Sequence, residues 1–362
     1  MERHRDNIGL LRLIFASLVI VGHAPEMTDG MRLREPLTRL FHTLSLGELA
    51  VDAFFLISGY LIANSWTRTQ SLRRYLARRW LRIFPAYAVA YLLCCFALGP
   101  MVGARPLQHL PETIARFALF APPPGYPGQL AGLYHPMLNG AMWTIPFEFR
   151  CYLLIALLGA SGLLYRRRTM LAITALGLAA SILLTFPSLR QPLDELDTKL
   201  ATQILVGSTY STIRLTTIFL AGSCFHLFKD QVLPRLAARS AAVLAVAALL
   251  LMYDPHLAEA GLTVFGGLAL FWLALKARIG PLQAVNDSWD ISYGVYLYGW
   301  PIAIFILYRN PHIAPGLLAA LALPLAFACG AVSWWGLEKR TKDLARSRSV
   351  ELAPATLVAR AA

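Results

Sequence analysis

Ten stretches of mainly apolar residues recur along the chain, separated by shorter polar segments. They lie at about residues 8–26, 46–66, 83–100, 142–162, 169–187, 211–228, 240–254, 260–275, 289–308 and 315–336. Most of them approach the length of about 20 residues that a helix needs to cross the hydrocarbon core of a bilayer. Because lipid cannot satisfy backbone polar groups, helices are the expected spanning structure. The pattern therefore predicts an all-α, polytopic integral membrane protein with about ten transmembrane helices.

Composition agrees with this class. Hydrophobic residues make up 57% of the 362 positions, charged residues only 15%, and the mean hydropathy is +0.54. A soluble globular protein has about 25% charged residues. We expect a single transmembrane domain over residues 1–340, followed by a basic cytoplasmic tail over 341–362. The first apolar stretch follows a basic leader, "MERHRDN", without a good cleavage site, so we interpret it as an uncleaved helix.

The basic residues predict the orientation. With the N-terminus placed in the cytoplasm, 23 Lys and Arg residues fall on cytoplasmic segments and nine on external ones. Cytoplasmic loops of membrane proteins carry such an excess, which favours both termini inside and an even number of spans. This distribution accounts for the net charge of +13 without nucleic acid as a partner.

Ionisable residues within apolar stretches are costly in a membrane and are candidates for function. Arg12 and His23 lie in the first stretch, eleven residues apart. In a helix this separation is roughly 16 Å along the axis and within about 20° of one face. Histidine suits proton transfer near neutral pH. The alternatives are an arginine that anchors the helix at the membrane surface and a histidine hydrogen-bonded within the bundle.

Two further segments combine polar and apolar positions. Asp52 and Ser58 lie in "GELAVDAFFLISGYLIANSW", where they could line a polar cavity. The alternative is that Asp52 caps a helix start and that Gly59 allows close packing. Arg79 and Arg82 belong to "SLRRYLARRWLRIFPAY" and are neighbours on a helix face by their i, i+3 spacing. Paired guanidinium groups bind phosphate well, although basic residues at this point also mark topology.

A fourth segment, "NGAMWTIPFEFRCYLL", carries Trp143 and Glu148 at the outer start of a span. Glu148 could pair with a local cation, orient His23 or hold a hydroxyl group. The long Pro- and Gly-rich segment before it suits a binding lid. The five cysteines lie in apolar stretches without metal-ligand spacing, so we expect no metal site.

These segments together resemble the acyltransferase-3 family, bacterial membrane proteins that O-acylate surface glycans. The resemblance includes the arginine–ten residues–histidine spacing from Arg12 to His23. It also includes the elements "VDAFFLISGYLI", "RRWLRIFPAY", "WTIPFE", "DISYGVYLYGWPI" and "VSWWGLEKR", which occur in the family's order up to about residue 340. The chain departs from the family's usual Phe at Tyr60, from its common His at Gly299 and from its common Pro at Arg340.

The resemblance implies a donor site for cytoplasmic acetyl-CoA. The phosphates of acetyl-CoA would meet Arg79 and Arg82, with Arg12 and Ser58 contributing to donor binding. No metal is required.

The resemblance also implies a catalytic group, His23, which acts as a general base or carries the acetyl group itself, with Arg12 and Glu148 assisting. Trp143, Asp52 and Glu148 would lie on the acceptor side. The acceptor would be a hydroxyl group of an exported glycan, such as an exopolysaccharide, O-antigen or lipid-linked repeat unit, at the bacterial inner membrane. Two other functions remain open: a transporter of a glycolipid or small anion, and a structural subunit of a polymer-export complex.

Overall fold

The computed structural model describes residues 6–69, 71–199, 207–286, 289–341 and 343, so that nearly all of the expected tail at 341–362 lies outside the described residues. The described part is helical and contains no strand. Its longer helices are α1 (Ile8–Asp29), α3 (Leu46–Thr69), α4 (Leu72–Leu93), α7 (Ile145–Ala160), α8 (Arg167–Leu183), α9 (Pro187–Asp197), α11 (Thr209–Val232), α12 (Ala238–Leu251), α15 (Ser292–Arg309) and α16 (Pro315–Ser333).

Shorter helical segments extend or connect these helices. The short α-helices are α2 (Pro36–Phe41), α5 (Gly99–Met101), α6 (Leu110–Ala118), α13 (Ala258–Gly261) and α14 (Gly267–Leu275). Turns of π-helix at η1 (Cys94–Leu98), η6 (Leu262–Gly266) and η8 (Trp334–Glu338) follow α4, join α13 to α14 and follow α16. The 3-10 turns are η2 (Pro106–His109), η3 (Gly140–Thr144), η4 (Leu163–Tyr165), η5 (Leu233–Arg235) and η7 (Gly280–Ala284).

Each of the ten predicted apolar stretches coincides with helix, which confirms the all-α class. Six described helical segments are long and apolar enough to cross a membrane: Ile8–Asp29, Leu46–Thr69, Leu72–Met101, Gly140–Ala160, Ala258–Leu275 and Pro315–Thr341. A seventh arises if α8 and α9, which meet at an angle of 98°, form one broken span. The chain is therefore a multi-pass membrane protein, and the count of ten crossings stays a prediction, as does the orientation.

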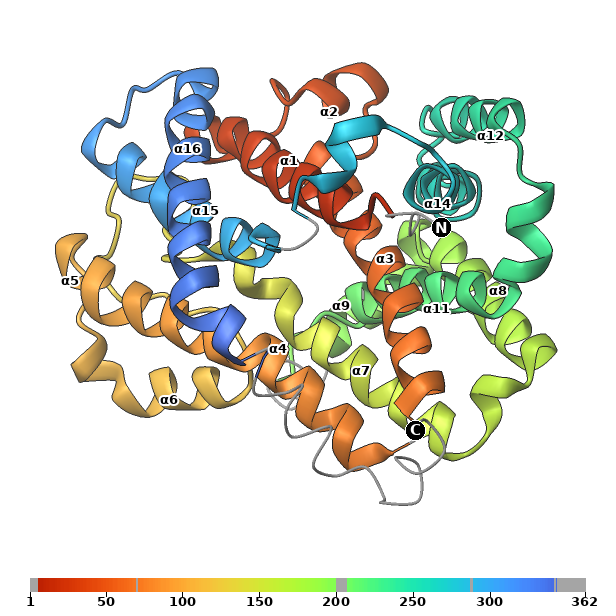
Figure 1. The fold of residues 1–362 in the computed structure, drawn as a ribbon. Helices are drawn as coiled ribbons and strands as arrows, with labels where there is room; N and C mark the ends of the chain where they lie inside the picture. Colours follow the sequence, from red (N-terminus) through yellow and green to blue (C-terminus); the bar gives the residue numbers. More distant parts are fainter. Residues whose placement is uncertain (1–5, 70, 200–206, 287–288, 342, 344–362) are drawn as a thin grey trace.

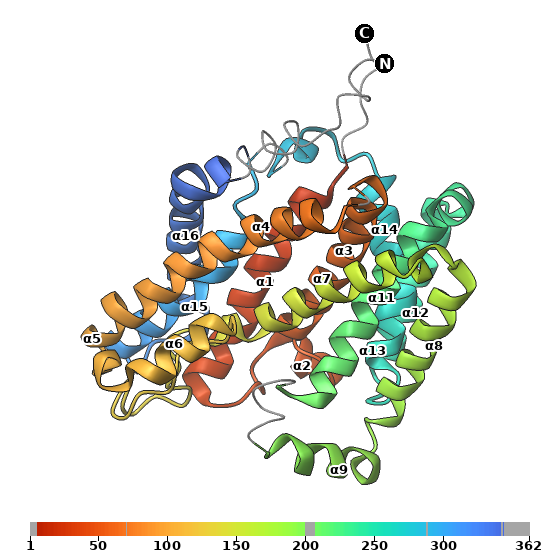
Figure 2. The same ribbon diagram turned by 90° about the horizontal axis from the view of Figure 1, so that it is seen from below.

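Helices α1 and α3 occupy the centre of the bundle. The pair α15 and α16 packs on one side of α1, whereas α11 and α8 lie beyond α3 on the other (Figure 1). Helix α12 stands at the periphery next to α14, and α9 crosses one end of the molecule, as Figure 2 shows. The side chains of α1 and α3 therefore face neighbouring helices on several sides. Cavities between these helices are lined partly by residues of α1 and α3.

Small residues bring α3 and α11 into backbone contact. A Cβ atom at Gly59 would lie 1.9 Å from the Phe219 carbonyl oxygen, and one at Gly222 would lie 2.0 Å from the Leu56 carbonyl oxygen. The Ser223 hydroxyl donates a hydrogen bond to the Gly59 carbonyl oxygen at 3.1 Å. Helices in membranes associate through such small residues and interhelical hydrogen bonds. This crossing fixes α3, which carries residues of every cavity described below.

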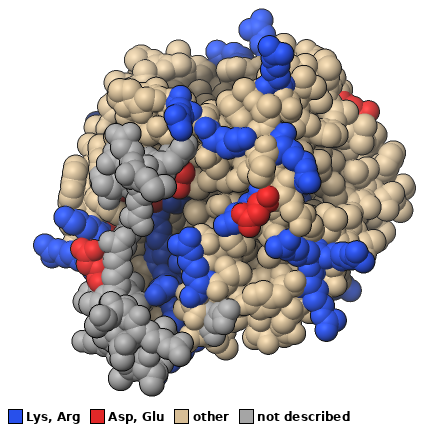
Figure 3. Space-filling view, turned by 45° about the vertical axis from the view of Figure 1, so that its right-hand side comes forward, with Lys and Arg blue, Asp and Glu red and all other residues tan. Residues whose placement is uncertain are grey.

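Lys and Arg side chains are prominent on the face shown in Figure 3. They spread over this face and into a hollow in it, with few Asp and Glu side chains among them. Basic residues gather on the cytoplasmic face of membrane proteins, so this face is a candidate for that side. Which face is cytoplasmic nevertheless remains the prediction made from the loops.

Candidate functional site

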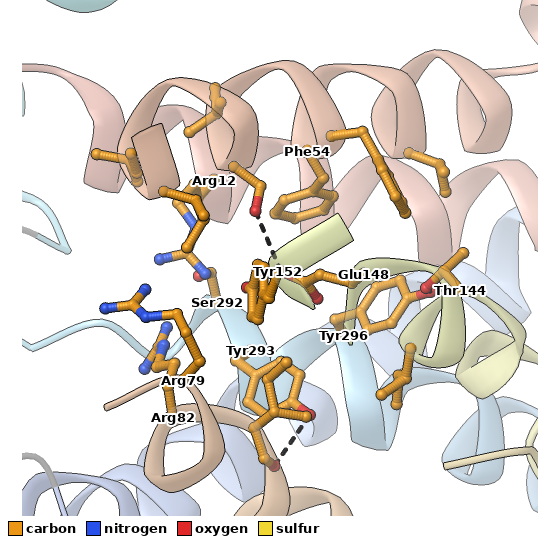
Figure 4. A pocket seen from close by; sticks show the side chains of 18 residues that line it. Arg12, Phe54, Arg79, Arg82, Thr144, Glu148, Tyr152, Ser292, Tyr293 and Tyr296 are labelled. Atoms are coloured by element: carbon orange, nitrogen blue, oxygen red, sulfur yellow. Dashed lines mark hydrogen bonds between the residues drawn. The ribbon is translucent and has the colours of Figure 1, made fainter. Parts of the chain in front are cut away.

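A first cavity, which we call the arginine cavity, lies among α1, α3, α4, α7 and α15 (Figure 4). It encloses about 870 Å³ of empty space, including its open mouth. Three guanidinium groups stand at one end, facing hydroxyl and carboxyl groups across the space. The polar residues of its lining are Arg12, Ser58, Arg79, Arg82, Thr144, Glu148, Tyr152, Ser292, Tyr293 and Tyr296. The structure thus brings together all four residues predicted for the donor site.

Two of the three arginines are held by carboxylates. Arg12 and Arg82 both pair with Asp290, which precedes α15, and the Arg82–Asp290 contact is 2.7 Å. Arg82 also lies 3.4 Å from a carboxylate oxygen of Glu338 in η8, and that carboxylate accepts a hydrogen bond from Ser333 at 3.0 Å. These contacts tie α1, α4, α15 and the end of α16 together. They also neutralise much of the charge of the two arginines.

Arg79 is different, because it has no carboxylate partner among the described residues. Its guanidinium lies 3.5 Å from the Ser65 hydroxyl and 5.9 Å from the centre of the Tyr152 ring. Its Nε atom is buried and makes no hydrogen bond. A guanidinium in this state has charge and donors available for an anion. Arg79 is therefore the strongest candidate in this cavity for binding a phosphate.

Glu148 lies across the arginine cavity from the guanidinium groups, next to Tyr152 (Figure 4). Its carboxylate accepts a hydrogen bond from the Ser58 hydroxyl at 3.4 Å and a second from the Tyr152 hydroxyl. The sequence left open whether Glu148 pairs with a cation, orients His23 or holds a hydroxyl group. In the structure it holds hydroxyl groups of the protein itself, and His23 lies in another cavity.

A second cavity, which we call the histidine cavity, has about 1440 Å³ of empty space, including its open mouth, and its lining includes His23 and Trp143. The His23 Nδ1 atom lies 3.0 Å from a carboxylate oxygen of Glu26, one turn further along α1. The His23 ring also packs edge-on against Trp300, with 5.0 Å between ring centres. A carboxylate on one ring nitrogen fixes the tautomer and leaves the other nitrogen for chemistry.

The space beside that other nitrogen is kept open by a glycine. A Cβ atom at Gly47 would lie 3.8 Å from the His23 Nε2 atom, and Gly47 itself lines the cavity. The Nε2 edge of the imidazole therefore faces a part of the wall that has no side chain. By contrast, Gly299 packs against α1, because a Cβ atom there would lie 2.5 Å from an Ile20 side-chain carbon. No larger residue fits at this position without a shift.

Paired charges border the histidine cavity. Arg32 bridges Glu26 and Glu48, at 3.2 and 3.0 Å respectively. Burial lowers the pKa of Arg32, but the two carboxylates outweigh burial and raise it above the ordinary value. Glu26 thus faces both the imidazole and a permanent cation.

The two cavities meet at α3. Val51 lines both of them, whereas Arg12 lines only the arginine cavity and His23 only the histidine cavity. Helix α1 thus carries one lining residue of each cavity, because Arg12 and His23 lie eleven residues apart along it. Asp52 lines neither of these two cavities, and its carboxylate pairs at 2.6 Å with Arg214 of α11, which lines the histidine cavity.

Sequence reasoning did not single out Glu26, Asp290 or Glu338 as site residues. The i, i+3 spacing of His23 and Glu26 is a local signal that could have revealed the first. Asp290 lies 278 residues from Arg12 and Glu338 lies 256 residues from Arg82. Pairings at such separations depend on the fold and leave no periodic signal in the sequence.

Comparisons with known proteins show which family the chain matches. Residues 5–335 match the family described as "Acyltransferase domain". The chain is 27% identical over 355 residues to an O-acetyl transferase of Shigella phage Sf6, covering 93% of this chain and 96% of the relative. It is 27% identical to nodulation protein 10 of Rhizobium leguminosarum bv. viciae over 82% of each chain. It is also 27% identical to a putative membrane-bound transacylase of Komagataeibacter xylinus, over 92% of this chain and 89% of the relative. No solved structure gives a significant match.

Proposed function

The chain belongs to the acyltransferase-3 family, and from this premise we propose that it transfers an acetyl group from acetyl-CoA to a hydroxyl group of an exported glycan. The observation that carries the proposal is the shared wall of the two cavities. Val51 lines a cavity in which Arg79 has no carboxylate partner among the described residues, and also a cavity that contains His23 with its carboxylate partner. A donor and an acceptor can therefore approach one helix from two sides.

Acetyl-CoA suits the arginine cavity. Its phosphates would contact the Arg79 guanidinium, and Arg82 and Arg12 would add donors beside it. Charge-assisted hydrogen bonds of this kind are among the strongest available to a protein. The thioester would then point past Glu148 and Tyr152 toward Val51.

The acceptor suits the histidine cavity, where Trp143 offers an aromatic face beside polar groups. His23 takes the proton of the acceptor hydroxyl, and the hydroxyl oxygen attacks the thioester carbonyl carbon. The carbon–sulfur bond breaks, the ester carbon–oxygen bond forms, and the proton passes to the departing sulfur of CoA. In the alternative course, the imidazole nitrogen attacks the thioester carbon, and CoA leaves as a thiolate that takes the imidazole proton. The acceptor hydroxyl then attacks the acetyl carbon, the carbon–nitrogen bond breaks, and the hydroxyl proton returns to the ring. Glu26 supports either course by orienting the ring.

Mass spectrometry of the surface glycan, from cells with and without this protein, tests the proposal. We expect an acetyl mass increment that disappears when the protein is removed and returns when it is restored. A transporter of a glycolipid or small anion would change the amount of material moved and leave the mass of the repeat unit unchanged. An unaltered glycan mass in cells that lack the protein would therefore refute acetyl transfer to that glycan.

A further inference from the structure

Hydroxyl groups make up more than half of the polar lining of the arginine cavity, and the protein itself uses their hydrogens. The six residues concerned are Ser58, Thr144, Tyr152, Ser292, Tyr293 and Tyr296. Ser58 and Tyr152 each donate a hydrogen bond to Glu148. Ser292 donates one to the carboxylate of Asp290. These three hydroxyl hydrogens are therefore not available to a ligand.

The other three hydroxyl groups are committed in the same way. Tyr293 donates a hydrogen bond to the Ile83 carbonyl oxygen at 3.3 Å. A hydroxyl has one hydrogen to donate, and Tyr296 gives its hydrogen to the Ala141 carbonyl oxygen. The 2.6 Å contact between Thr144 and Tyr296 therefore uses the hydrogen of Thr144. Among the described side chains of this lining, only the guanidinium groups keep donors for a ligand.

Glu148, in contrast, offers an acceptor. Both of its hydrogen bonds end on the same carboxylate oxygen, Oε1. The second oxygen, Oε2, has no hydrogen-bond partner, and the carboxylate has no ion pair, within the part of the chain that the structure describes. Glu148 is only partly buried and lines the cavity. A carboxylate inside a membrane protein is costly unless it has partners. A ligand that donates a hydrogen bond would supply the missing partner.

The two sides of the arginine cavity therefore suit opposite kinds of ligand group. The guanidinium groups offer donors and positive charge, whereas Glu148, across the space from them, offers an acceptor and negative charge (Figure 4). The apolar part of the lining includes Phe54, Ile57 and Ile145. A matching ligand has phosphate at one end, an apolar body and an N–H or O–H donor further along. The pantetheine arm of CoA has this order, because its methyl groups and two amide N–H groups follow the phosphates.

We propose that Glu148 Oε2 accepts a hydrogen bond from the pantetheine amide N–H nearer the sulfur, while Arg79 binds the phosphates. This inference rests on the proposed function and makes Glu148 a positioning residue for the donor, whereas the family resemblance implied the acceptor side. The amide farther from the phosphates is the one that meets Glu148, because Glu148 lies across the cavity from the guanidinium groups. Tyr152 links the two subsites, since its ring centre lies 5.9 Å from Arg79 and its hydroxyl donates to Glu148.

Calorimetric titration of the purified full-length protein with two ligands tests this assignment without depending on catalysis. The ligands are CoA and adenosine 3′-phosphate 5′-diphosphate, which keeps the phosphates of CoA and lacks pantetheine. Glu148→Gln should raise the Kd for CoA about tenfold or more, because a hydrogen bond to a charged group is lost, and should leave the Kd for the nucleotide unchanged. Arg79→Ala should raise both. Glu112→Gln is the matched control, because Glu112 is exposed and lies outside the cavity lining, and it should change neither.

A CoA analogue with an ester oxygen in place of the amide nitrogen nearer the sulfur tests the N–H group itself. The wild type should bind this analogue about tenfold less tightly than CoA, and Glu148→Gln should bind the two with similar affinity. Equal affinity of the wild type for both would overturn the proposal even if Glu148→Gln does not fold.

The remaining outcomes are equally decisive. Wild-type CoA affinity in folded Glu148→Gln, or an equal loss for CoA and the nucleotide, would overturn the proposal. Lost acetyl transfer with wild-type CoA affinity would place Glu148 in the chemistry or at the acceptor and would also overturn it. A wild-type protein that binds no CoA would count against the proposed function, and this inference would fall with it. CoA binding that does not depend on Glu148 would count against this inference alone.

Discussion

Arg79 and Arg82 lie one turn apart on α4, yet the structure predicts opposite consequences when each is replaced by alanine. Arg82 is paired with Asp290 and Glu338, whereas Arg79 has no carboxylate partner among the described residues. Arg79→Ala should therefore weaken donor binding and leave stability almost unchanged. Arg82→Ala should mainly destabilise the protein.

The magnitudes follow from these contacts. A hydrogen bond to a charged group contributes about 1.5–3 kcal/mol, so that Arg79→Ala should raise the Kd for CoA by about tenfold to 150-fold. Arg79→Lys should recover only part of this loss, because an ammonium cannot make a two-pronged contact with phosphate. Arg82→Ala leaves Glu338, whose side chain is 4% exposed, without its cation. Removing one partner of a buried pair costs about 3–5 kcal/mol, and we expect the lower end here because Arg82 lines an open cavity.

Calorimetric titration of CoA into each purified variant, together with an unfolding curve in the same detergent, separates the two effects. Arg73→Ala is the control, since Arg73 is an exposed arginine of the same helix that does not line the cavity. Wild-type CoA affinity in folded Arg79→Ala would refute the assignment of the donor site. Wild-type stability of Arg82→Ala would refute the view that its ion pairs hold the helices together.

Three further changes should have separable effects. Glu26→Gln should lower the rate of acetyl transfer by about tenfold or more at unchanged CoA affinity, because the imidazole loses its orienting carboxylate; an unchanged rate would make that contact incidental. Val51→Trp should block acetyl transfer between the two cavities while CoA still binds. Val51→Ala should admit butyryl-CoA as a donor. The rates of transfer from acetyl-CoA and from butyryl-CoA, measured for each variant, test both expectations. Gly222→Ala should lower stability by about 1–3 kcal/mol, because its Cβ atom would lie 2.0 Å from a carbonyl oxygen of α3. Gly316→Ala, with open space around it, should have no such effect in the same unfolding assay.

Local spacing predicted much of this architecture. The apolar stretches predicted where helices lie, because a helix that faces lipid or other helices needs a long apolar sequence. The i, i+3 spacing of Arg79 and Arg82 correctly placed them on one side of a helix, and both line the same cavity. Arg12 and His23 lie on one helix, as predicted, but they line different cavities.

Pairings between distant segments were beyond this reasoning. Asp52 was a candidate for substrate binding, but the sequence holds no sign that Arg214, 162 residues away, would pair with it. Glu148 and His23 both looked suitable for one catalytic group, yet the crossing of α1, α3 and α7 puts them in separate cavities. Hydrophobic periodicity describes one helix at a time. Which faces meet depends on packing details such as the close contact at Gly59 and Gly222.

The acetyl content of the surface glycan made by cells expressing His23→Gln tests the central claim most directly. Glutamine keeps hydrogen-bonding capacity but cannot accept a proton or carry the acetyl group. His312→Gln, at an exposed position, is the control at matched protein level. The account predicts full acetylation with His312→Gln and no acetyl increment with His23→Gln, although the latter protein inserts and binds CoA normally. Normal acetylation with His23→Gln would contradict the account, because the imidazole would then only pack against its neighbours.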